Sequence, residues 1–239
     1  MKRLDVKFKN DGTYPVIISN DYSELPGMIK EMYPSLKRIC IVSDSDVAPL
    51  YLMTVRSLLS DCCEKISDHV FPAGEGSKTY ETVLSIYDTL LKNDFNRKDL
   101  IIALGGGVTG DMAAFAASTY MRGTRFINLP TSLLAMADSS VGGKCGVDYD
   151  LYKNIVGSIY MPSLVYASTQ VLSSLPDRQY SSGMAEILKA GLIKDATYYE
   201  WLISSFSEIM DRDSEYTAQM IERAVSIKQF FVTKDPFET

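Results

Sequence analysis

Four glycines in seven residues, Gly105-Gly-Gly-Val-Thr-Gly-Asp111, constrain the fold of this chain more than any other feature. They follow an apolar run at 100–104 that predicts a buried strand, and they open an alanine-rich segment that predicts a helix over 109–120. Glycine lets the backbone turn tightly and lets a phosphate approach its N–H groups, while the helix dipole favours the negative charge. We therefore expect residues 105–111 to hold the phosphates of a nucleotide cofactor.

A structural turn would not need three consecutive glycines followed by Gly110. The run also lacks the spacing G-x-G-x-x-G, and it follows a late strand instead of the first one. A standard Rossmann dehydrogenase is therefore disfavoured.

Strand and helix signals alternate along the first 175 residues. Period-two alternation at 4–8 and an apolar run at 14–18, joined by an Asp11-Gly12 turn, predict a hairpin. The remaining expected strands are 38–43, 69–72, 100–104 and 125–130, and the expected helices are 22–33, 48–59, 78–92 and 109–120. Strands interleaved with helices predict a parallel sheet that is covered on both faces.

Strand signals stop near residue 175, and three helical segments follow at 180–194, 196–210 and 213–233. Pro176 is a plausible start for the first of these helices. The sequence thus predicts an α/β protein in two parts. A Rossmann-like, parallel-sheet nucleotide-binding domain spans 1–175, and the start of an all-α C-terminal domain spans 176–239.

Charge and composition narrow the class of protein. The net charge of −6 and a pI near 4.9 argue against non-specific binding to nucleic acid, which needs a basic surface. The N-terminus has no apolar stretch typical of a signal peptide, and no apolar run approaches the length of about 18 residues that a membrane span needs. The four cysteines form no C-x-x-C pair and are expected to be reduced thiols: Cys40, Cys62, Cys63 and Cys145. We expect a cytoplasmic protein.

Two further loops follow expected strands at the edge where parallel sheets bind ligands. Asp44 and Asp46 end an early strand, where a carboxylate accepts hydrogen bonds from a ribose hydroxyl or simply caps the next helix; the residues leave both readings open. The loop Gly74–Lys78 occupies the equivalent place after the next strand.

The segment 130–157 is the densest in functional side chains. Its donors, acceptors and cations are Thr131, Ser132, Asp138, Ser139, Ser140, Lys144, Lys153 and Asn154. With Arg122 just upstream, the two lysines suit an anionic, phosphorylated substrate. Glu186 and Lys189 lie three residues apart on an expected helix, where an ordinary salt pair is the simplest interpretation.

Together these segments resemble the 3-dehydroquinate synthases of the sugar phosphate cyclase family. The matching motifs, in register from Asp44 onward, are Gly105–Asp111, Arg122-Gly123, Pro130–Ala135, Asp138–Lys144, Lys153–Gly157, Leu175–Arg178 and Gly183–Lys189. So many motifs in the same order make the resemblance specific.

The resemblance implies NAD as cofactor, a divalent metal (zinc or cobalt), and a phosphorylated seven-carbon keto acid as substrate. It places NAD against Asp44, Glu75, Lys78, Gly106, Gly107, Val108, Thr109, Gly110, Asp111, Thr131, Ser132, Lys144, Lys153, Val171, Leu172, Ser173 and Ser174. It places the substrate against Asp138, Lys144, Lys153, Asn154 and Lys189. Arg122 would reach the substrate phosphate across a homodimer interface, and Glu186 would be one of three metal ligands.

The implied reaction converts 3-deoxy-D-arabino-heptulosonate 7-phosphate into 3-dehydroquinate and phosphate, a step of the shikimate pathway to aromatic amino acids. NAD⁺ takes a hydride from a substrate alcohol whose hydroxyl the metal acidifies, and phosphate then leaves by elimination. NADH returns the hydride, and an intramolecular aldol step closes the ring. The enzyme mainly holds charge and geometry.

Departures from the family pattern are few, but one concerns the metal. Ser132 replaces a threonine, Ala114 replaces a common glycine, and Asp148 stands where members have Asn or Asp. The two histidines that complete the family's metal site are missing, and the single histidine, His69, is expected to be structural. We therefore expect a fragment that binds NAD weakly and turns over negligibly.

Three alternatives stay open at this point. Another sugar phosphate cyclase, of the 2-deoxy-scyllo-inosose synthase type, would act on a hexose phosphate. An iron-dependent alcohol dehydrogenase shares the architecture but would not need so many phosphate-binding cations. A non-catalytic nucleotide-binding module is the alternative from a different class.

Overall fold

The computed structural model describes residues 1–8 and 12–234, and within these ranges the main sheet has the order β1-β2-β9-β6-β5-β3-β4. Its strands are β1 (Lys2–Phe8), β2 (Gly12–Ser19), β3 (Arg38–Asp44), β4 (Lys65–Phe71), β5 (Leu100–Gly105), β6 (Arg125–Pro130) and β9 (Leu164–Ser168). Within the described part of this sheet, β1 and β2 pair antiparallel and every other pairing is parallel. The predicted α/β class and Rossmann-like sheet are confirmed.

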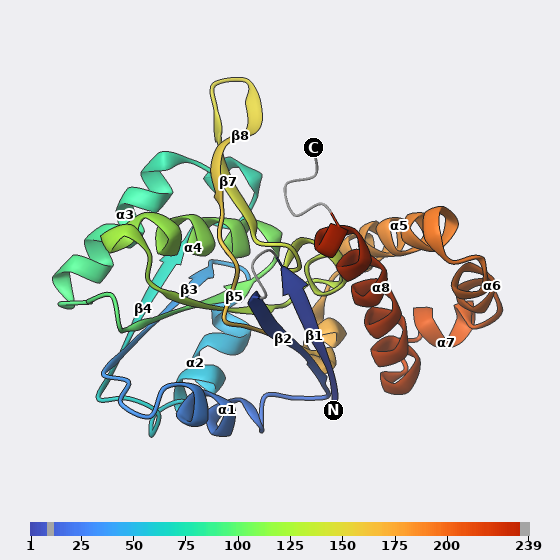
Figure 1. Cartoon of the computed structure of the whole chain (residues 1–239), viewed down its shortest axis with the longest axis horizontal. Helices are drawn as coiled ribbons and strands as arrows, with labels where there is room; N and C mark the ends of the chain where they lie inside the picture. The colour runs from blue at the N-terminus through green and yellow to red at the C-terminus, as the bar shows by residue number, and fades with distance from the viewer. Residues whose placement is uncertain (9–11, 235–239) are drawn as a thin grey trace.

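Helices cover both faces of this sheet, as Figure 1 shows. The helices of this part are α1 (Leu25–Met32), α2 (Ala48–Leu58), α3 (Tyr80–Lys92) and α4 (Gly107–Thr119). Along β3, Ile39 and Ile41 face the core that includes α1 and α2, while Cys40 and Val42 face the core that includes α3 and α4. Alternate side chains of a strand point to opposite faces, so strands buried on both faces read as continuous apolar runs.

A second, two-stranded sheet projects from the body as a hairpin (Figure 1). It consists of β7 (Lys144–Tyr149) and β8 (Tyr152–Ile159), and it packs against α4. A π-helical turn at Ala135–Ser139 lies just before it. The sequence signals missed β7, β8 and β9, and the predicted turn at Asp11 lies outside the described residues.

The C-terminal helices lie together at one end of the sheet (Figure 1): α5 (Asp177–Lys194), α6 (Ala196–Ser204), α7 (Phe206–Met210) and α8 (Ser214–Lys234). Pro176 precedes α5, as predicted, but the helix predicted over 196–210 is broken at Ser205 into α6 and α7. Helix α8 packs along β1, and one apolar core runs from the sheet into α5–α8. In the described ranges no helix combines the length and the apolar content that crossing a membrane requires.

Candidate active site

The glycine run lies where β5 ends and α4 begins, at the carboxyl edge of the sheet. Strand β5 ends at Gly105, and α4 starts at Gly107, two residues earlier than the sequence predicted. A cavity of about 600 Å³ opens beside it, which we call the glycine cavity. Its lining includes Asp44, Asp46, Tyr51, Gly74, Gly106, Gly107, Val108, Thr109, Thr131, Ser132, Ser174 and Gln179.

Neighbouring side chains approach the glycine run closely, so these positions need glycine for space as well as for the turn. A Cβ at Gly105 would lie 2.4 Å from Oγ1 of Thr109, closer than real atoms come. Gly106 has more room, because a Cβ there would lie 3.5 Å from Oγ of Ser132. No side chain in the described part of the chain caps the N-terminus of α4. The first N–H groups of a helix lack partners within it, so this end of α4 suits a phosphate group.

Asp44 joins β3 to α4 at the wall of the glycine cavity. Its Oδ1 accepts hydrogen bonds from the backbone N–H groups of Asp46 and Val47, both at 3.0 Å. Its Oδ2 accepts the hydroxyl of Thr109 at 2.8 Å. The carboxylate therefore holds the turn before α2 and also lines the cavity, so the capping and ligand-binding interpretations are compatible.

A second cavity, of about 860 Å³, is rich in cations, and we call it the lysine cavity. Four lysines contribute to its wall: Lys78, Lys144, Lys189 and Lys228. Its other polar residues include Asp111, Asp138, Ser139, Asn154 and Ser158. These come from the loop before α3, from α4, from the π-helical turn, from the hairpin and from α5 and α8. Such a cluster suits a substrate with several negative charges.

Lys78 links three elements within the lysine cavity. Its Nζ lies 2.5 Å from Oδ2 of Asp111, and it also donates to Oδ1 of Asn154. Burial raises the pKa of the Asp111 carboxyl, and the hydrogen bond and charge of Lys78 oppose that rise. A buried carboxylate needs such a partner, because an unpaired buried charge is costly. The network thus fixes the hairpin residue Asn154 against α4.

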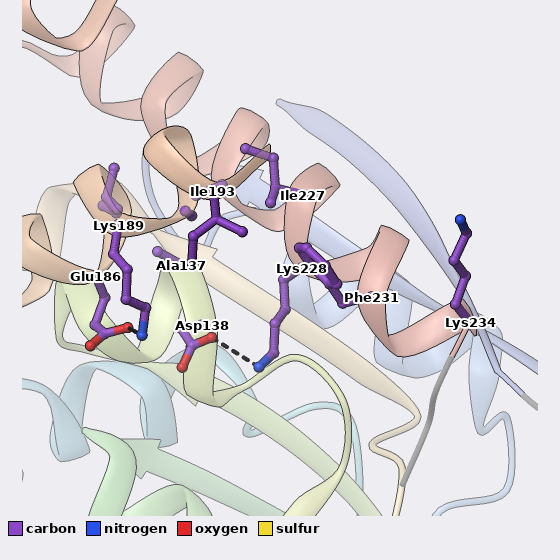
Figure 2. A pocket seen from close by; sticks show the side chains of 12 residues that line it. Ala137, Asp138, Glu186, Lys189, Ile193, Ile227, Lys228, Phe231 and Lys234 are labelled. Atoms are coloured by element: carbon purple, nitrogen blue, oxygen red, sulfur yellow. Dashed lines mark ion pairs between the residues drawn. The ribbon is translucent and has the colours of Figure 1, made fainter. Parts of the chain in front are cut away.

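Figure 2 shows a groove between α5 and α8 that adjoins the lysine cavity. Nζ of Lys228, on α8, lies 3.0 Å from Oδ1 of Asp138 on the π-helical turn. Lys189 forms an ion pair with Glu186 one turn earlier on α5. The groove has a volume of about 460 Å³ and is lined largely by apolar side chains. Asp138, Lys189 and Lys228 line both spaces, so they stand at the junction between groove and cavity.

Several residues that the resemblance assigns to the site lie elsewhere. Lys153 is largely exposed and forms an ion pair of 3.2 Å with Glu75, and neither lines the two cavities. In the segment 171–174 only Ser174 lines the glycine cavity, while Val171 and Leu172 are buried in the core. Ser174 and the carbonyl of Val171 both hydrogen-bond the hydroxyl of Tyr51.

Arg122 lines neither cavity of its own chain, and its backbone is strained. Met121 and Arg122 have φ values of 50° and 64°, in the left-handed region that few non-glycine residues adopt. The guanidinium of Arg97 donates two hydrogen bonds, of 3.2 and 2.9 Å, to the carbonyl of Met121. Such strain persists only where the surroundings impose it, and it gathers at functional sites.

The described residues do not by themselves form a metal site. Residues 1–8 and 12–234 contain no group of three His, Cys, Asp or Glu side chains placed to hold an ion. A catalytic zinc usually has three protein ligands, and Glu186 is a single carboxylate. His69 hydrogen-bonds the hydroxyls of Thr89 and Ser85, which agrees with its predicted structural role.

Lys228 is a cation of the lysine cavity that the sequence signals missed. It lies about forty residues after the last matching motif, Gly183–Lys189, on a helix that the sequence predicts only as a helical segment. One signal was present: the lysine follows Ile227 and lies one turn after Ala224, both of which are buried. A lysine on the buried side of a helix has to meet a partner or line a cavity.

Two protein-family models match this chain, one after the other. The family model described as 3-dehydroquinate synthase N-terminal matches residues 68–182, and the model described as 3-dehydroquinate synthase C-terminal matches 183–239. The 3-dehydroquinate synthase of Teredinibacter turnerae is 42% identical over 227 residues, which cover 95% of this chain and 62% of the relative. Those of Neisseria meningitidis and Methylococcus capsulatus are 40% and 41% identical over 239 residues, 100% of this chain and 66% of each relative.

Solved structures of related cyclases share the fold. A 2-deoxy-scyllo-inosose synthase complexed with carbaglucose-6-phosphate, NAD⁺ and Co²⁺ superposes with a TM-score of 0.85 at 25% identity, covering 100% of this chain and 64% of that one. A 2-epi-5-epi-valiolone synthase from Streptomyces hygroscopicus, with NAD⁺ and Zn²⁺ bound, gives 0.87 at 28% identity, covering 98% and 65%. An iron-containing alcohol dehydrogenase, at 16% identity and a TM-score of 0.70, shares the fold alone; it covers 92% of this chain and 67% of that one.

The chain thus spans between 62% and 66% of the length of these curated relatives. The two family models follow each other without a gap from residue 68 to residue 239. The identity of 40–42% extends over at least 95% of the chain. The chain belongs to the 3-dehydroquinate synthase family.

Proposed function

We propose that this protein acts as a 3-dehydroquinate synthase, an NAD- and metal-dependent lyase. Its substrate would be 3-deoxy-D-arabino-heptulosonate 7-phosphate, and its products would be 3-dehydroquinate and phosphate. One observation carries the proposal: an uncapped helix N-terminus and a lysine-lined cavity share helix α4. A dinucleotide would occupy the glycine cavity, and a phosphorylated keto acid would occupy the lysine cavity beside it.

The glycine cavity fits NAD. Gly106 and Gly107 leave room for the pyrophosphate at the start of α4, and Asp44 stands at the end of a neighbouring strand, where a ribose would lie. Thr131, Ser132 and Ser174 add hydroxyls to the wall. NAD supplies transient oxidation of a substrate alcohol, which acidifies the neighbouring C–H bond. These residues bind the cofactor and orient it.

In the lysine cavity, cations and amides would hold the substrate. Lys144, Lys189 and Lys228 would neutralise its phosphate and carboxylate, and Asn154 would donate its amide to an oxygen. Asp138 holds the Lys228 ammonium group in place. Lys153 and Glu75 would meet NAD from the rim of the site.

The metal, the oligomer and the domain boundary are further parts of the proposal. Two of the structural neighbours are solved with Co²⁺ or Zn²⁺ bound, and Glu186 would supply one metal ligand here, while the described residues do not by themselves complete a metal site. Arg122 would serve the site of a partner subunit in a cytoplasmic homodimer, which is supported by its position outside the cavities of its own chain. The nucleotide-binding domain would end near residue 175, just before α5 begins at Asp177.

Two measurements test the activity. Titration of the 239-residue chain with NAD⁺ should show binding that is weakened in Gly106→Ala. The product of the whole gene should release phosphate from the heptulosonate phosphate, and EDTA should abolish the release. Lys144→Ala should abolish turnover and leave NAD⁺ binding largely intact. Release that is insensitive to EDTA, or no release at all, would contradict the proposal.

A hexose phosphate cyclase is the second candidate, because a 2-deoxy-scyllo-inosose synthase superposes on the whole chain. Glucose 6-phosphate tested in the same assay distinguishes the two. Turnover of glucose 6-phosphate without turnover of the heptulosonate phosphate would favour this second candidate.

A further inference from the structure

The β7–β8 hairpin contains a bulge where it meets the lysine cavity. Its antiparallel pairing shifts so that one residue of β7, Asp148, lies opposite three residues of β8, 153–155. Bulges bend a strand, redirect its side chains and are common beside functional sites. The three bulged residues include Lys153 and Asn154, the two hairpin residues that the proposed function places at the cofactor and the substrate.

Asp148 supplies the hydrogen bond that the interrupted ladder cannot. Its Oδ1 accepts the backbone N–H of Asn154 at 2.7 Å. Its own N–H donates to the carbonyl of Lys78 at 2.8 Å. The side chain of Asp148 therefore joins β7 to the bulge in β8. Its backbone N–H joins the hairpin to the loop before α3.

The bulge holds Asn154 in an uncommon conformation. Its φ of 54° lies in the left-handed region, which asparagine tolerates better than most residues but which still needs support. The contact from Asp148 is made to the N–H of this same residue. Loss of the acceptor would let the bulge relax toward ordinary strand geometry.

The side chain of Asn154 is then oriented by Lys78. Lys78 donates to the amide oxygen Oδ1, so the NH₂ group is the end of the amide that can donate to an oxyanion. Both ends of this arrangement have to be fixed for the amide to point into the cavity. Lys78 fixes the side chain, and Asp148 fixes the backbone.

We propose that Asp148 is a positioning residue for substrate binding, which holds the β8 bulge so that Asn154 presents its amide to the lysine cavity. The proposal rests on the proposed function, because it takes Asn154 to contact the phosphorylated substrate. What matters is the acceptor oxygen, since the contact is to a backbone N–H. The negative charge is dispensable.

Two substitutions at Asp148 separate the acceptor from the charge. Asp148→Ala removes both, and Asp148→Asn keeps Oδ1. In the phosphate-release assay, Asp148→Ala should lower kcat/KM for the heptulosonate phosphate by roughly 10- to 100-fold, the size expected when a substrate-binding group is misplaced. Asp148→Asn should restore most of the loss.

Asp150→Asn is the matched control, because it removes a carboxylate from the turn of the same hairpin at a left-handed position that asparagine accepts. It should behave as the unsubstituted protein. Wild-type kcat/KM in Asp148→Ala would overturn the proposal. An equal loss in Asp148→Asn would also overturn it, because the charge would then be what matters.

Hydrogen exchange at the Asn154 amide tests the positioning without any substrate. In the 239-residue chain this amide should exchange faster in Asp148→Ala and stay protected in Asp148→Asn, with circular dichroism confirming that both variants are folded. Unchanged exchange in Asp148→Ala would overturn the proposal even if phosphate release is confirmed. Absence of phosphate release from the unsubstituted protein would instead reject the proposed function, and the exchange result would still decide the role of Asp148.

Discussion

Thr109 and Asp44 meet at the wall of the glycine cavity, where the threonine hydroxyl donates to Oδ2 of the carboxylate over 2.8 Å. Thr109 is fully buried, and Asp44 is 9% exposed. The contact joins the first turn of α4 to the carboxyl end of β3, two elements far apart in sequence. It therefore fixes the glycine run relative to the strand that would hold the ribose.

Thr109→Val should lower both stability and NAD⁺ affinity. Valine keeps the shape but leaves a buried carboxylate oxygen without its donor, so the free energy of unfolding should fall by about 1–3 kcal/mol. Thr109→Ser keeps the hydroxyl and should lose less. Urea unfolding and NAD⁺ titration measure the two effects, and a valine variant as stable as the unsubstituted chain would show that the contact contributes nothing.

Neighbouring glycines should respond differently to alanine. In Gly105→Ala the new Cβ would lie 2.4 Å from Oγ1 and 2.5 Å from Cβ of Thr109, and overpacking of this kind costs about 1–3 kcal/mol. Gly106→Ala has ordinary contacts, the nearest at 3.5 Å, but its methyl group occupies the space where a phosphate would approach.

We therefore expect Gly106→Ala to keep its stability and to raise the Kd for NAD⁺ by roughly tenfold, which corresponds to about 1.4 kcal/mol. Thermal unfolding and calorimetric titration of both variants provide the comparison. If Gly106→Ala binds NAD⁺ normally, the phosphates do not approach the backbone at this glycine.

Lys78→Met should destabilise the protein in a pH-dependent way. Burial raises the pKa of Asp111, and Lys78 limits the rise. A carboxyl whose pKa is raised in the folded state costs stability when it is ionised, and the cost disappears as the pH falls through the folded-state pKa toward the unfolded value. Without Lys78 the cost at neutral pH should grow by about 2–3 kcal/mol, somewhat less than for a fully buried pair.

The difference between Lys78→Met and the unsubstituted chain should therefore shrink in acid. Urea unfolding across the range from neutral to acid pH measures it. Lys153→Met is a suitable control, because it breaks the exposed pair with Glu75 and should cost less than about 1 kcal/mol. A deficit in Lys78→Met that is constant with pH would argue against Asp111 as its origin.

Gly183→Ala tests how α5 is placed. A Cβ at Gly183 would lie 2.8 Å from the backbone nitrogen of Leu134 and from Cβ of Leu133, so α5 has to move away from the segment that follows β6. We expect a loss of about 1–3 kcal/mol. Gly27→Ala, in α1 with no atom within 4 Å of the new Cβ, should instead stabilise by about 0.4–1 kcal/mol. Equal effects of the two substitutions would contradict the close approach.

The central sheet was predictable because burial on both faces leaves an unmistakable pattern. Every residue of β5 is buried, so its sequence is an apolar run without polar interruptions. β9 is equally buried, but it follows a proline-containing loop and the β7–β8 hairpin instead of a predicted helix, so the strand–helix alternation that marked the other strands did not mark it.

The hairpin could not be recognised for a different reason. Its strands contain glycines that read as loop signals, yet Gly157 is needed because a Cβ there would lie 2.1 Å from the carbonyl oxygen of Cys145. β8 is mostly exposed and interrupted by the bulge, so no alternation marks it. Its structure depends on packing against α4, a contact that no local pattern encodes.

Site residues that belong to local sequence motifs were predicted, and those placed by long-range packing were not. The glycine run, Asp44 and Lys144 lie in or beside local motifs whose chemistry can be read from spacing. Lys228 joins the lysine cavity only through the packing of α8 against the π-helical turn. Long-range packing of this kind has no counterpart in a short stretch of sequence.

Helix α4 belongs to both cavities, with Gly107 at one and Asp111, a turn later, at the other. From Met112 to Ala117 every residue of this helix is buried, so it cannot move without disturbing the core. A dinucleotide and a second ligand bound at the two cavities would therefore share one buried helix as a common support. Lys189 on α5 and Lys228 on α8 line the same lysine cavity as Asp111, so the second ligand would lie between this buried helix and the C-terminal helices.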